Sequence, residues 1–200
     1  PMAANQTANV EWRDGVVPVS KKFDDPYFSI SGGLGETRHV FLGGNDLPAR
    51  FRPDFQVAEL GFGTGLNMLA TYIAWAASGQ SGSLHYTSFE AFPLSVNDIR
   101  LALLNFPEAQ AVAGPFLDEW EKGKRKFSIG TMICDVIMGD ARQTLPKWPQ
   151  KADAWYLDGF SPAKNPELWG LQLLRDVARH TNTDGTFATY TAAGQVRQHL

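Results

Sequence analysis

The stretch QVAELGFGTGLN (residues 56–67) joins a short apolar run to a glycine-rich turn and then to the start of a helix. Residues 56–60 have the length and composition of a buried strand, and NMLATYIAWAA (67–77) has those of a helix. Glycines at alternate positions let the main chain turn tightly and let a ligand approach the N–H groups at the helix start. The stretch therefore predicts a strand–turn–helix unit with a ligand-binding turn.

Strands and helices alternate along the rest of the chain. Apolar runs predict further strands at 84–90, 132–140, 153–158 and 186–191, and FSI (127–129) is expected to pair with the second of these across Gly130. Helices are expected at 97–106, at 109–123 with a break at Gly114-Pro115, and at 166–181. This alternation predicts the α/β class, with a doubly wound, mostly parallel sheet whose ligands bind outside the carboxyl ends of the strands.

The first quarter of the chain has a different character. Residues 10–54 are rich in Gly, Pro and Asp and contain only short apolar pieces. They predict strands or a hairpin, followed by a short helix near Glu36–Leu42. We therefore expect a small N-terminal extension, residues 1–54, that packs on a core formed by residues 55–200.

Composition excludes several classes of protein. Two hundred residues suffice for one sizeable core, and 44% hydrophobic with 20% charged residues is typical of globular proteins. The net charge of −3 means that a nucleic acid would have to bind a local basic patch. A single cysteine, Cys134, and histidines without ligand spacing predict no metal. The chain has neither a bilayer-spanning segment nor a secretory signal, so we expect a cytoplasmic protein without a membrane partner.

The turn ELGFGTG (59–65) favours S-adenosylmethionine over other nucleotide cofactors. A nicotinamide dinucleotide fingerprint needs a third glycine where this chain has Leu66, and no Gly-Lys-Ser/Thr follows as in a phosphate loop. Glu59 would repel a pyrophosphate but would attract the ammonium group of an amino acid. The alternative is a tight turn that carries glycines for its geometry alone.

Acidic residues also follow the next three strands. Glu90 can accept hydrogen bonds from both hydroxyls of a ribose, each worth roughly 1.5–3 kcal/mol. Asp140, with the backbone of Ala141, can read the edge of an adenine, and Asp158 lies beside the expected position of a methyl donor. The simpler alternatives are a surface acid for Glu90, a helix cap for Asp140 and a turn cap for Asp158.

The stretch LDGFSPAKNPELW (157–169) adds candidate substrate contacts. Phe160 can stack on a flat base, although it can instead pack inward, and Lys164 can meet a phosphate. Lys164 and Arg197 are expected to flank the pocket near the strand ends. They are better candidates for RNA contact than the basic segment EKGKRK (121–126), which is more typical of a solvated turn.

Six segments together resemble the methyltransferase domain of the MnmC family, the tRNA 5-methylaminomethyl-2-thiouridine biosynthesis proteins. They are FDDPYFS (23–29), GLGETRHVFLGGN (33–45), AELGFGTGLN (58–67), SFEAFPL (88–94), DAWYLDGFSPAKNPELW (153–169) and TYTAAGQVR (189–197). The resemblance implies a Rossmann-like class I methyltransferase that uses S-adenosylmethionine to methylate the aminomethyl nitrogen on the wobble uridine of certain tRNAs. It further implies that Asp158 is the catalytic acidic residue, and that the glycine loop and Glu90 hold the cofactor.

The candidate site follows from the chemistry of these residues together with the resemblance. Asp158 is expected to orient the amine and stabilise the cation that forms on it, and Phe160 to seat the uracil ring. The candidate cofactor-binding residues are Glu59, Gly61, Gly63, Thr64, Gly65, Asn67, Glu90, Asp140, Ala141 and, over the methionine end, Asn45. The expected partners are a tRNA anticodon stem-loop and a flavin-dependent oxidoreductase domain or protein that supplies the aminomethyl substrate.

The chain departs from this family in two respects. It stops at Leu200, before a final pair of strands and a basic end, so the sheet is expected to lack its C-terminal edge strands. It also contains no flavin-binding domain. Two other functions stay open: an aminopropyltransferase-like enzyme on the same fold, and a non-catalytic module that binds S-adenosylmethionine or tRNA.

Overall fold

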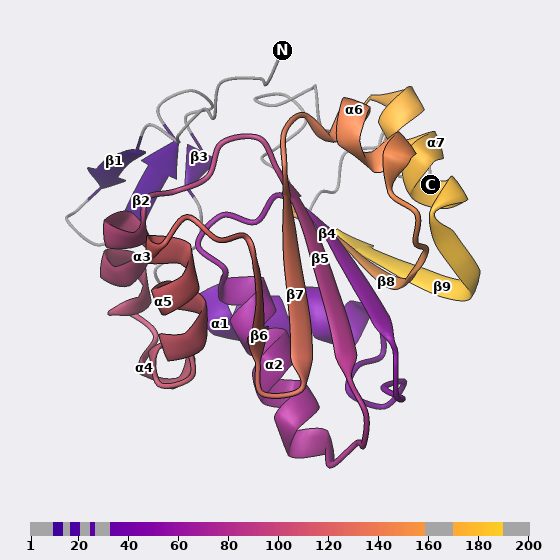
Figure 1. Cartoon of the computed structure of the whole chain (residues 1–200), viewed down its shortest axis with the longest axis horizontal. Helices are drawn as coiled ribbons and strands as arrows, with labels where there is room; N and C mark the ends of the chain where they lie inside the picture. Colours follow the sequence, from indigo (N-terminus) through magenta and orange to yellow (C-terminus); the bar gives the residue numbers. More distant parts are fainter. Residues whose placement is uncertain (1–9, 14–16, 21–24, 27–32, 159–169, 190–200) are drawn as a thin grey trace.

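The computed structural model of the chain describes residues 10–13, 17–20, 25–26, 33–158 and 170–189 (Figure 1). Near the N-terminus, a small antiparallel sheet has the order β1-β2-β3. Its strands are β1 (Val10–Arg13), β2 (Val17–Ser20) and β3 (Asp25–Pro26). These strands agree with the hairpin expected from the sequence.

A six-stranded sheet forms the centre of the molecule and has the order β6-β7-β5-β4-β8-β9. Its strands are β4 (Gln56–Leu60), β5 (Leu84–Glu90), β6 (Lys126–Ile129), β7 (Met132–Met138), β8 (Ala152–Leu157) and β9 (Thr181–Thr189). Every neighbouring pair is parallel except β6 and β7, which form the expected hairpin. From β4 the chain first builds outward to β5 and β7 and then returns to add β8 and β9, which confirms the doubly wound prediction.

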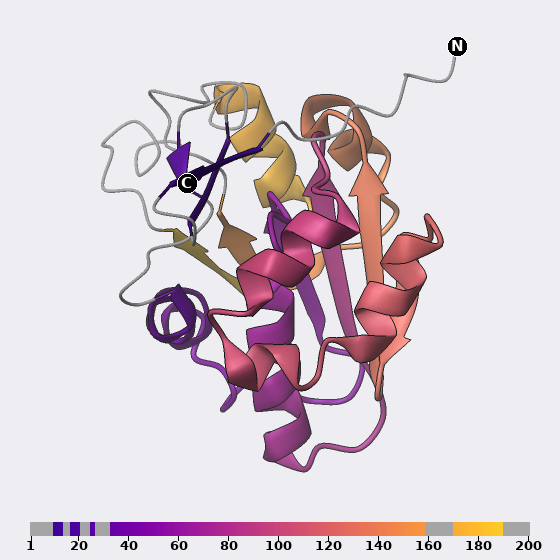
Figure 2. The ribbon, with the colours of Figure 1, turned by 90° about the vertical axis from the view of Figure 1, so that its left-hand side faces the viewer.

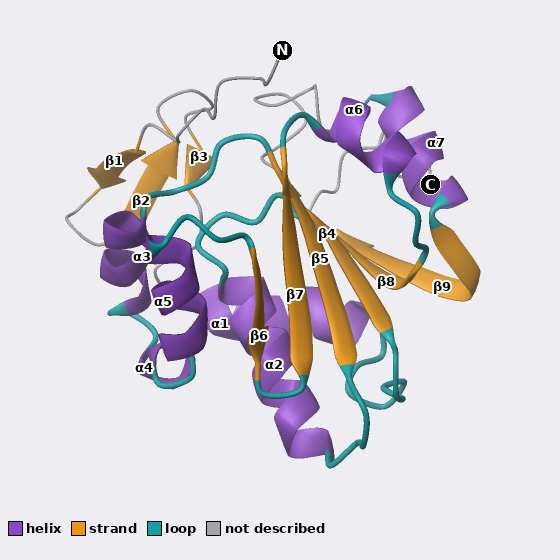
Figure 3. Ribbon diagram, viewed as in Figure 1, coloured by secondary structure: helices purple, strands orange, loops and turns teal. Residues whose placement is uncertain are grey.

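Helices cover both faces of this sheet (Figures 2 and 3). One face carries α1 (Gly33–Thr37), the π-helical segment η1 (Arg38–Gly43), α2 (Leu66–Ser78), α3 (Val96–Leu103), α4 (Pro107–Gln110) and α5 (Gly114–Glu121). The other carries α6 (Ala141–Thr144), the short 3-10 turn η2 (Leu145–Lys147) and α7 (Leu171–Arg179). Successive residues of a strand point to opposite faces, so Val57 and Tyr156 join one core while Ala58 and Trp155 join the other.

Two helical predictions differ from the structure in detail. The segment expected to be helical over 109–123 does break at Gly114-Pro115, which opens α5, but its first part, α4, begins earlier, at Pro107, and already ends at Gln110. Proline suits the first turn of a helix, where its missing N–H would have no partner in any case. The helix expected near Glu36–Leu42 begins at Gly33 and widens into η1 after Thr37.

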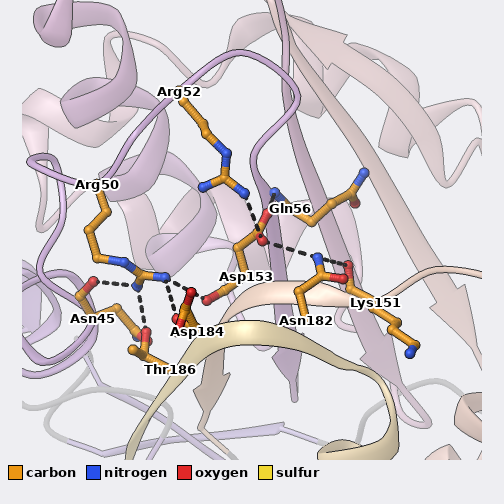
Figure 4. A network of polar contacts seen from close by, with 9 residues as sticks. All are labelled: Asn45, Arg50, Arg52, Gln56, Lys151, Asp153, Asn182, Asp184 and Thr186. Atoms are coloured by element: carbon orange, nitrogen blue, oxygen red, sulfur yellow. Dashed lines mark hydrogen bonds and ion pairs between the residues drawn. The ribbon is translucent and has the colours of Figure 1, made fainter.

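The segment before β4 is fastened to the sheet by a buried polar network (Figure 4). The Arg50 guanidinium donates to the carbonyl oxygens of Asn45, Asp153 and Asp184 and to the Thr186 hydroxyl, at 2.6–3.1 Å. Asp153 is 4% exposed and accepts from Arg52, from the Gln56 N–H and from Asn182. Since Arg50 and Asp153 join β4, β8 and β9, this network secures the amino ends of the strands, opposite the expected ligand site.

Candidate active site

The predicted acidic residues meet at one edge of the sheet. Parallel registers align Leu60 at the end of β4 with Phe89 and Leu157, and Glu90 with Met138. The residues that follow the four central strands therefore start from the same edge, as the alternation of strands and helices predicts. Three of the candidates, Glu59, Glu90 and Asp158, are linked there to the glycine turn or to the start of α2.

The glycine turn has the backbone geometry that a close ligand requires. Gly61, Gly63 and Gly65 have φ angles of 87°, 56° and 81°, all in the left-handed region that favours glycine. Gly65 is the N-cap of α2 and leaves the first N–H groups of that helix directed out of its start. The N–H groups of the three glycines bond within the protein, to the Phe89 carbonyl, the Glu90 carboxylate and the Phe62 carbonyl. What the turn offers a ligand is therefore close approach to a main chain without side chains in front of it.

Glu90 holds this turn from the neighbouring strand. One of its carboxylate oxygens accepts from the Gly63 N–H at 3.0 Å, and the other accepts from the Phe92 N–H at 3.1 Å. Burial raises the pKa of Glu90, and these backbone hydrogen bonds oppose that shift because they favour the charged form. Each oxygen of a carboxylate can accept more than one hydrogen bond, so Glu90 can hold the turn and bind a ligand hydroxyl together.

Glu59 and Asp158 are connected through Asn67. The Asn67 amide nitrogen donates to Glu59 at 2.9 Å and to Asp158 at 2.6 Å, and the Ser88 hydroxyl donates to the second oxygen of Glu59 at 2.8 Å. Burial, and then the nearby charge of Asp158, raise the pKa of Glu59 well above its usual range. The two carboxyl groups are thus one coupled unit, in which burial favours the proton on Glu59.

Several residues of this site were not expected from the sequence. Thr37, from α1, donates its hydroxyl to the Asn67 side-chain oxygen at 2.9 Å. Phe62, inside the glycine turn, stacks on Trp120 at 5.0 Å between ring centroids, and Arg125 lies 3.7 Å from the centroid of Trp120 on α5. Thr37 and Trp120 are distant in sequence from the turn, so no local spacing indicated them.

Asp140 and Ala141 occupy the start of α6. Asp140 is the N-cap, where its side chain accepts from the Arg142 N–H at 2.9 Å and forms an ion pair with the Arg142 guanidinium. Ala141 is buried. The structure thus shows the capping role that the sequence offered as the simpler alternative, and the predicted contact with an adenine base stays a prediction.

Asn45 lies in the polar network of Figure 4. Its buried amide donates to the carbonyl oxygens of Phe41 and Trp155, and its side-chain oxygen accepts from Thr186. These contacts attach η1 to β8 and β9. The predicted contact of Asn45 with the cofactor stays a prediction, as does that of Thr64, which is buried in the glycine turn.

The structure describes the basic segment 121–126 but not the residues predicted to contact the RNA substrate. Phe160, Lys164 and Arg197 lie outside the described residues. In the basic segment 121–126, Lys122 and Lys124 both pair with Glu119 at 3.3 Å, and Lys126 lies 4.0 Å from Asp135. These pairs agree with the interpretation of this segment as a solvated turn.

Neither a membrane span nor a metal cluster appears in the part of the chain that the structure describes. No helix there is both long and apolar enough to cross a bilayer. Among the same residues, no three His, Cys, Asp or Glu side chains are grouped to hold a metal ion.

Comparisons with known proteins agree with this geometry. Residues 107–200 match a family described as S-adenosyl-L-methionine-dependent methyltransferase. The tRNA 5-methylaminomethyl-2-thiouridine biosynthesis bifunctional protein MnmC of Aeromonas hydrophila is 43% identical over 96% of this chain. The chain is thus similar to S-adenosyl-L-methionine-dependent methyltransferases. The MnmC protein of Leptospira borgpetersenii is 40% identical to it over a similar share of the chain.

The chain spans about a third of the length of these relatives, 32% of the Aeromonas protein and 31% of the Leptospira protein. A crystal structure of MNMC2 from Aquifex aeolicus aligns with 98% of the chain and 64% of its own length, with a TM-score of 0.75 and 24% identity. This likeness confirms the predicted Rossmann-like fold.

The glycine turn gives a first testable prediction. A Cβ on Gly65 would lie 3.1 Å from Phe62 and 3.2 Å from Phe116, in a backbone conformation that already disfavours a side chain. A left-handed backbone alone costs a residue with a side chain roughly 1–2 kcal/mol. Because of the added steric contacts, we expect Gly65→Ala to lower the free energy of unfolding by more than this amount. Urea denaturation of both proteins measures this loss.

Gly79 provides a matched control at the other end of α2. Its φ of 72° is similar, and a Cβ there would meet nothing within 4 Å. Gly79→Ala should therefore show the backbone cost alone and leave binding of S-adenosylmethionine intact, whereas Gly65→Ala should weaken binding. Equal losses of stability in the two variants would contradict a steric role for Gly65.

Glu59 gives a prediction about pH. Its pKa is raised in the folded protein, so the folded state retains a proton that the unfolded state has released. The stabilisation due to this proton is complete below the unfolded pKa, about 4.3, and is lost as pH rises toward the folded pKa. Denaturation measures the free energy of unfolding of Glu59→Gln and of the unaltered protein at pH 5 and pH 8. The stability of the variant relative to the unaltered protein should therefore be higher at pH 8 than at pH 5. A difference independent of pH would show that Glu59 is ionised in the fold.

Proposed function

We propose that this chain transfers a methyl group from S-adenosylmethionine to the aminomethyl nitrogen on the wobble uridine of a tRNA. The observation that carries the proposal is the Asp158 carboxylate at the end of β8, joined through Asn67 to Glu59 and to the glycine turn. The names of the MnmC relatives support the same chemistry and the same class of RNA. The word bifunctional in those names supports a second activity beside that of this chain. We propose that this second activity is an oxidoreductase that supplies the aminomethyl group, and that both act in the cytoplasm.

The residues present fit this cofactor. The three left-handed glycines open the main chain to a close ligand, and Glu90 offers a carboxylate beside them for the ribose hydroxyls. The negative charge of Asp158 complements the positive charge of the donor. When bound, the donor supplies an electrophilic methyl carbon on a positively charged sulfur.

Asp158 has an electrostatic task at this site rather than that of a strong base. The amine must attack in its neutral form. With a pKa of about 10.4, removing the proton from the ammonium at pH 7 costs roughly 4–5 kcal/mol. A carboxylate beside an ammonium raises the pKa of that ammonium, so Asp158 cannot reduce this cost by its charge. It can orient the neutral amine and stabilise the cation that develops on it.

Two measurements test the function in sequence. Calorimetry should first show binding of S-adenosylmethionine to the chain. Nucleoside mass spectrometry of undermodified tRNA, incubated with the chain and isotope-labelled donor, should then show the label on the aminomethyl uridine. Binding without any transfer would favour a non-catalytic module, and transfer of an aminopropyl group from the decarboxylated donor would favour the other enzyme class.

A further inference from the structure

Asn67 lies where the two carboxyl groups of the site meet. Its amide nitrogen carries two hydrogens, and both are used, one for Glu59 at 2.9 Å and one for Asp158 at 2.6 Å. Asn67 itself is 5% exposed in the first turn of α2. One side chain from the helix thus sets the separation between carboxyl groups that come from two different strands, β4 and β8.

Thr37 lies against the oxygen side of this amide. Its hydroxyl lies 2.9 Å from the Asn67 side-chain oxygen and 2.9 Å from the Gly33 carbonyl oxygen. The hydroxyl has a single hydrogen, so these two oxygens are alternative acceptors for it. Thr37 is 2% exposed, so water does not readily replace it. Only when the Asn67 oxygen faces Thr37 do the amide hydrogens face the carboxyl groups, and the reverse orientation would put an oxygen against both of them.

We propose that Thr37 and Asn67 are positioning residues that fix the Asp158 carboxylate beside Glu59 for methyl transfer. The inference rests on the proposed function for the role of Asp158, but not for the contacts themselves. The distance in sequence, 30 residues between Thr37 and Asn67 and 91 between Asn67 and Asp158, makes this an arrangement that only the fold creates.

This geometry affects which of the two carboxyl groups, Glu59 or Asp158, carries the negative charge. Two ionised carboxylates on one amide would repel each other, and burial together with the charge of Asp158 raises the pKa of Glu59. The Ser88 hydroxyl also bonds to Glu59 and can accept from a protonated carboxyl as well as donate to an ionised one. Asp158 can then carry the negative charge of the pair, stabilised by the Asn67 donor.

The experiment compares Thr37→Val with Thr37→Ser. Valine retains the shape of threonine but has no hydroxyl to orient the amide, whereas serine keeps the hydroxyl. Thr71→Val is the matched control, because Thr71 is equally buried on α2 but bonds to the Asn67 backbone oxygen and the Tyr156 hydroxyl instead. Thr37→Ala provides a second variant without the hydroxyl, should valine prevent folding.

The primary readout is the titration of the Asp158 carboxyl carbon by NMR in the full chain, assigned from the signal that disappears in Asp158→Asn. We expect the pKa of Asp158 to rise in Thr37→Val and Thr37→Ala, because a donor to its charged form is lost. It should stay unchanged in Thr37→Ser and Thr71→Val. The rate of methyl transfer to tRNA should fall about tenfold in Thr37→Val, in line with a lost hydrogen bond to a charged group, and should recover in Thr37→Ser.

An unchanged Asp158 titration in both variants without the hydroxyl would overturn the inference, and so would an equal shift in Thr71→Val. These outcomes are distinct from failure of the proposed function. If the unaltered chain transfers no methyl group to tRNA while the Asp158 titration shifts as expected, the function is wrong and the positioning contacts stand. If transfer occurs and the titration does not respond, the positioning role alone is wrong.

Discussion

Asp158→Ala is expected to lower the rate of methyl transfer by about two to three orders of magnitude, the usual effect of removing one electrostatic stabiliser from an active site. Asp158 directly follows β8, which ends at Leu157. Its carboxylate is the group that the amine cation would face as it forms. Single-turnover assays with labelled donor and undermodified tRNA measure the loss. Calorimetry should show that S-adenosylmethionine still binds, since Glu90 and the glycine turn are unchanged.

Two further variants separate charge from stability. Asp158→Asn keeps the size of the side chain but not its charge, so it should lose most of the activity as well. Asp135→Ala removes a carboxylate of the same sheet, on β7, whose nearest cation, Lys126, lies 4.0 Å away, and should remain active. Full activity in Asp158→Ala would show that the amine is oriented by another group.

Glu90→Ala is expected to weaken binding of S-adenosylmethionine by about two orders of magnitude or more. Hydrogen bonds to a charged group contribute roughly 1.5–3 kcal/mol each, and the variant would lose those to both ribose hydroxyls. It would also release the Gly63 and Phe92 N–H groups, which Glu90 now holds at 3.0 and 3.1 Å. Isothermal calorimetry of the two proteins gives the ratio of dissociation constants.

The controls for Glu90 distinguish ligand binding from support of the turn. Glu90→Gln keeps one acceptor oxygen and should lose less affinity than alanine. Glu108→Ala removes an exposed carboxylate that pairs with Arg38 at 2.7 Å, away from the turn, and should bind the donor normally. If Glu90→Ala bound the donor with unchanged affinity, the ribose would have to contact another residue.

Local patterns predicted the elements better than their ends. The strands at 56–60 and 84–90 have the bounds expected from their apolar runs, and the Ser95 side chain accepts from the Asp98 N–H as a helix cap should. By contrast, β9 begins at Thr181, five residues before the expected strand. Of residues 181–185, Thr181 alone pairs with β8, opposite Ala152. The register then shifts so that Thr186 pairs with Ala154, and no local pattern records this irregular start of β9.

The same contrast applies to the site. Glycines between a strand and a helix, and acidic residues after parallel strands, are local signals, so the sequence could predict Glu59, Glu90 and Asp158 as site residues without the fold. The contact of Asn67 with the cofactor stays a prediction, and the structure adds that its amide joins two carboxyl groups. Asp140 caps α6 and pairs with Arg142, a role that its position in the sequence left open beside the predicted contact with adenine.

The order of apolar runs, glycines and acids along the chain was enough to determine a doubly wound sheet with acidic side chains at its carboxyl edge, because strand and helix periods and glycine torsions are local properties. Only the tertiary structure decided that Thr37 orients Asn67, that Trp120 braces Phe62, and that Arg50 secures the opposite edge. These contacts join residues far apart in sequence, and their energies depend on burial and on distances that exist only once the helices pack on the sheet.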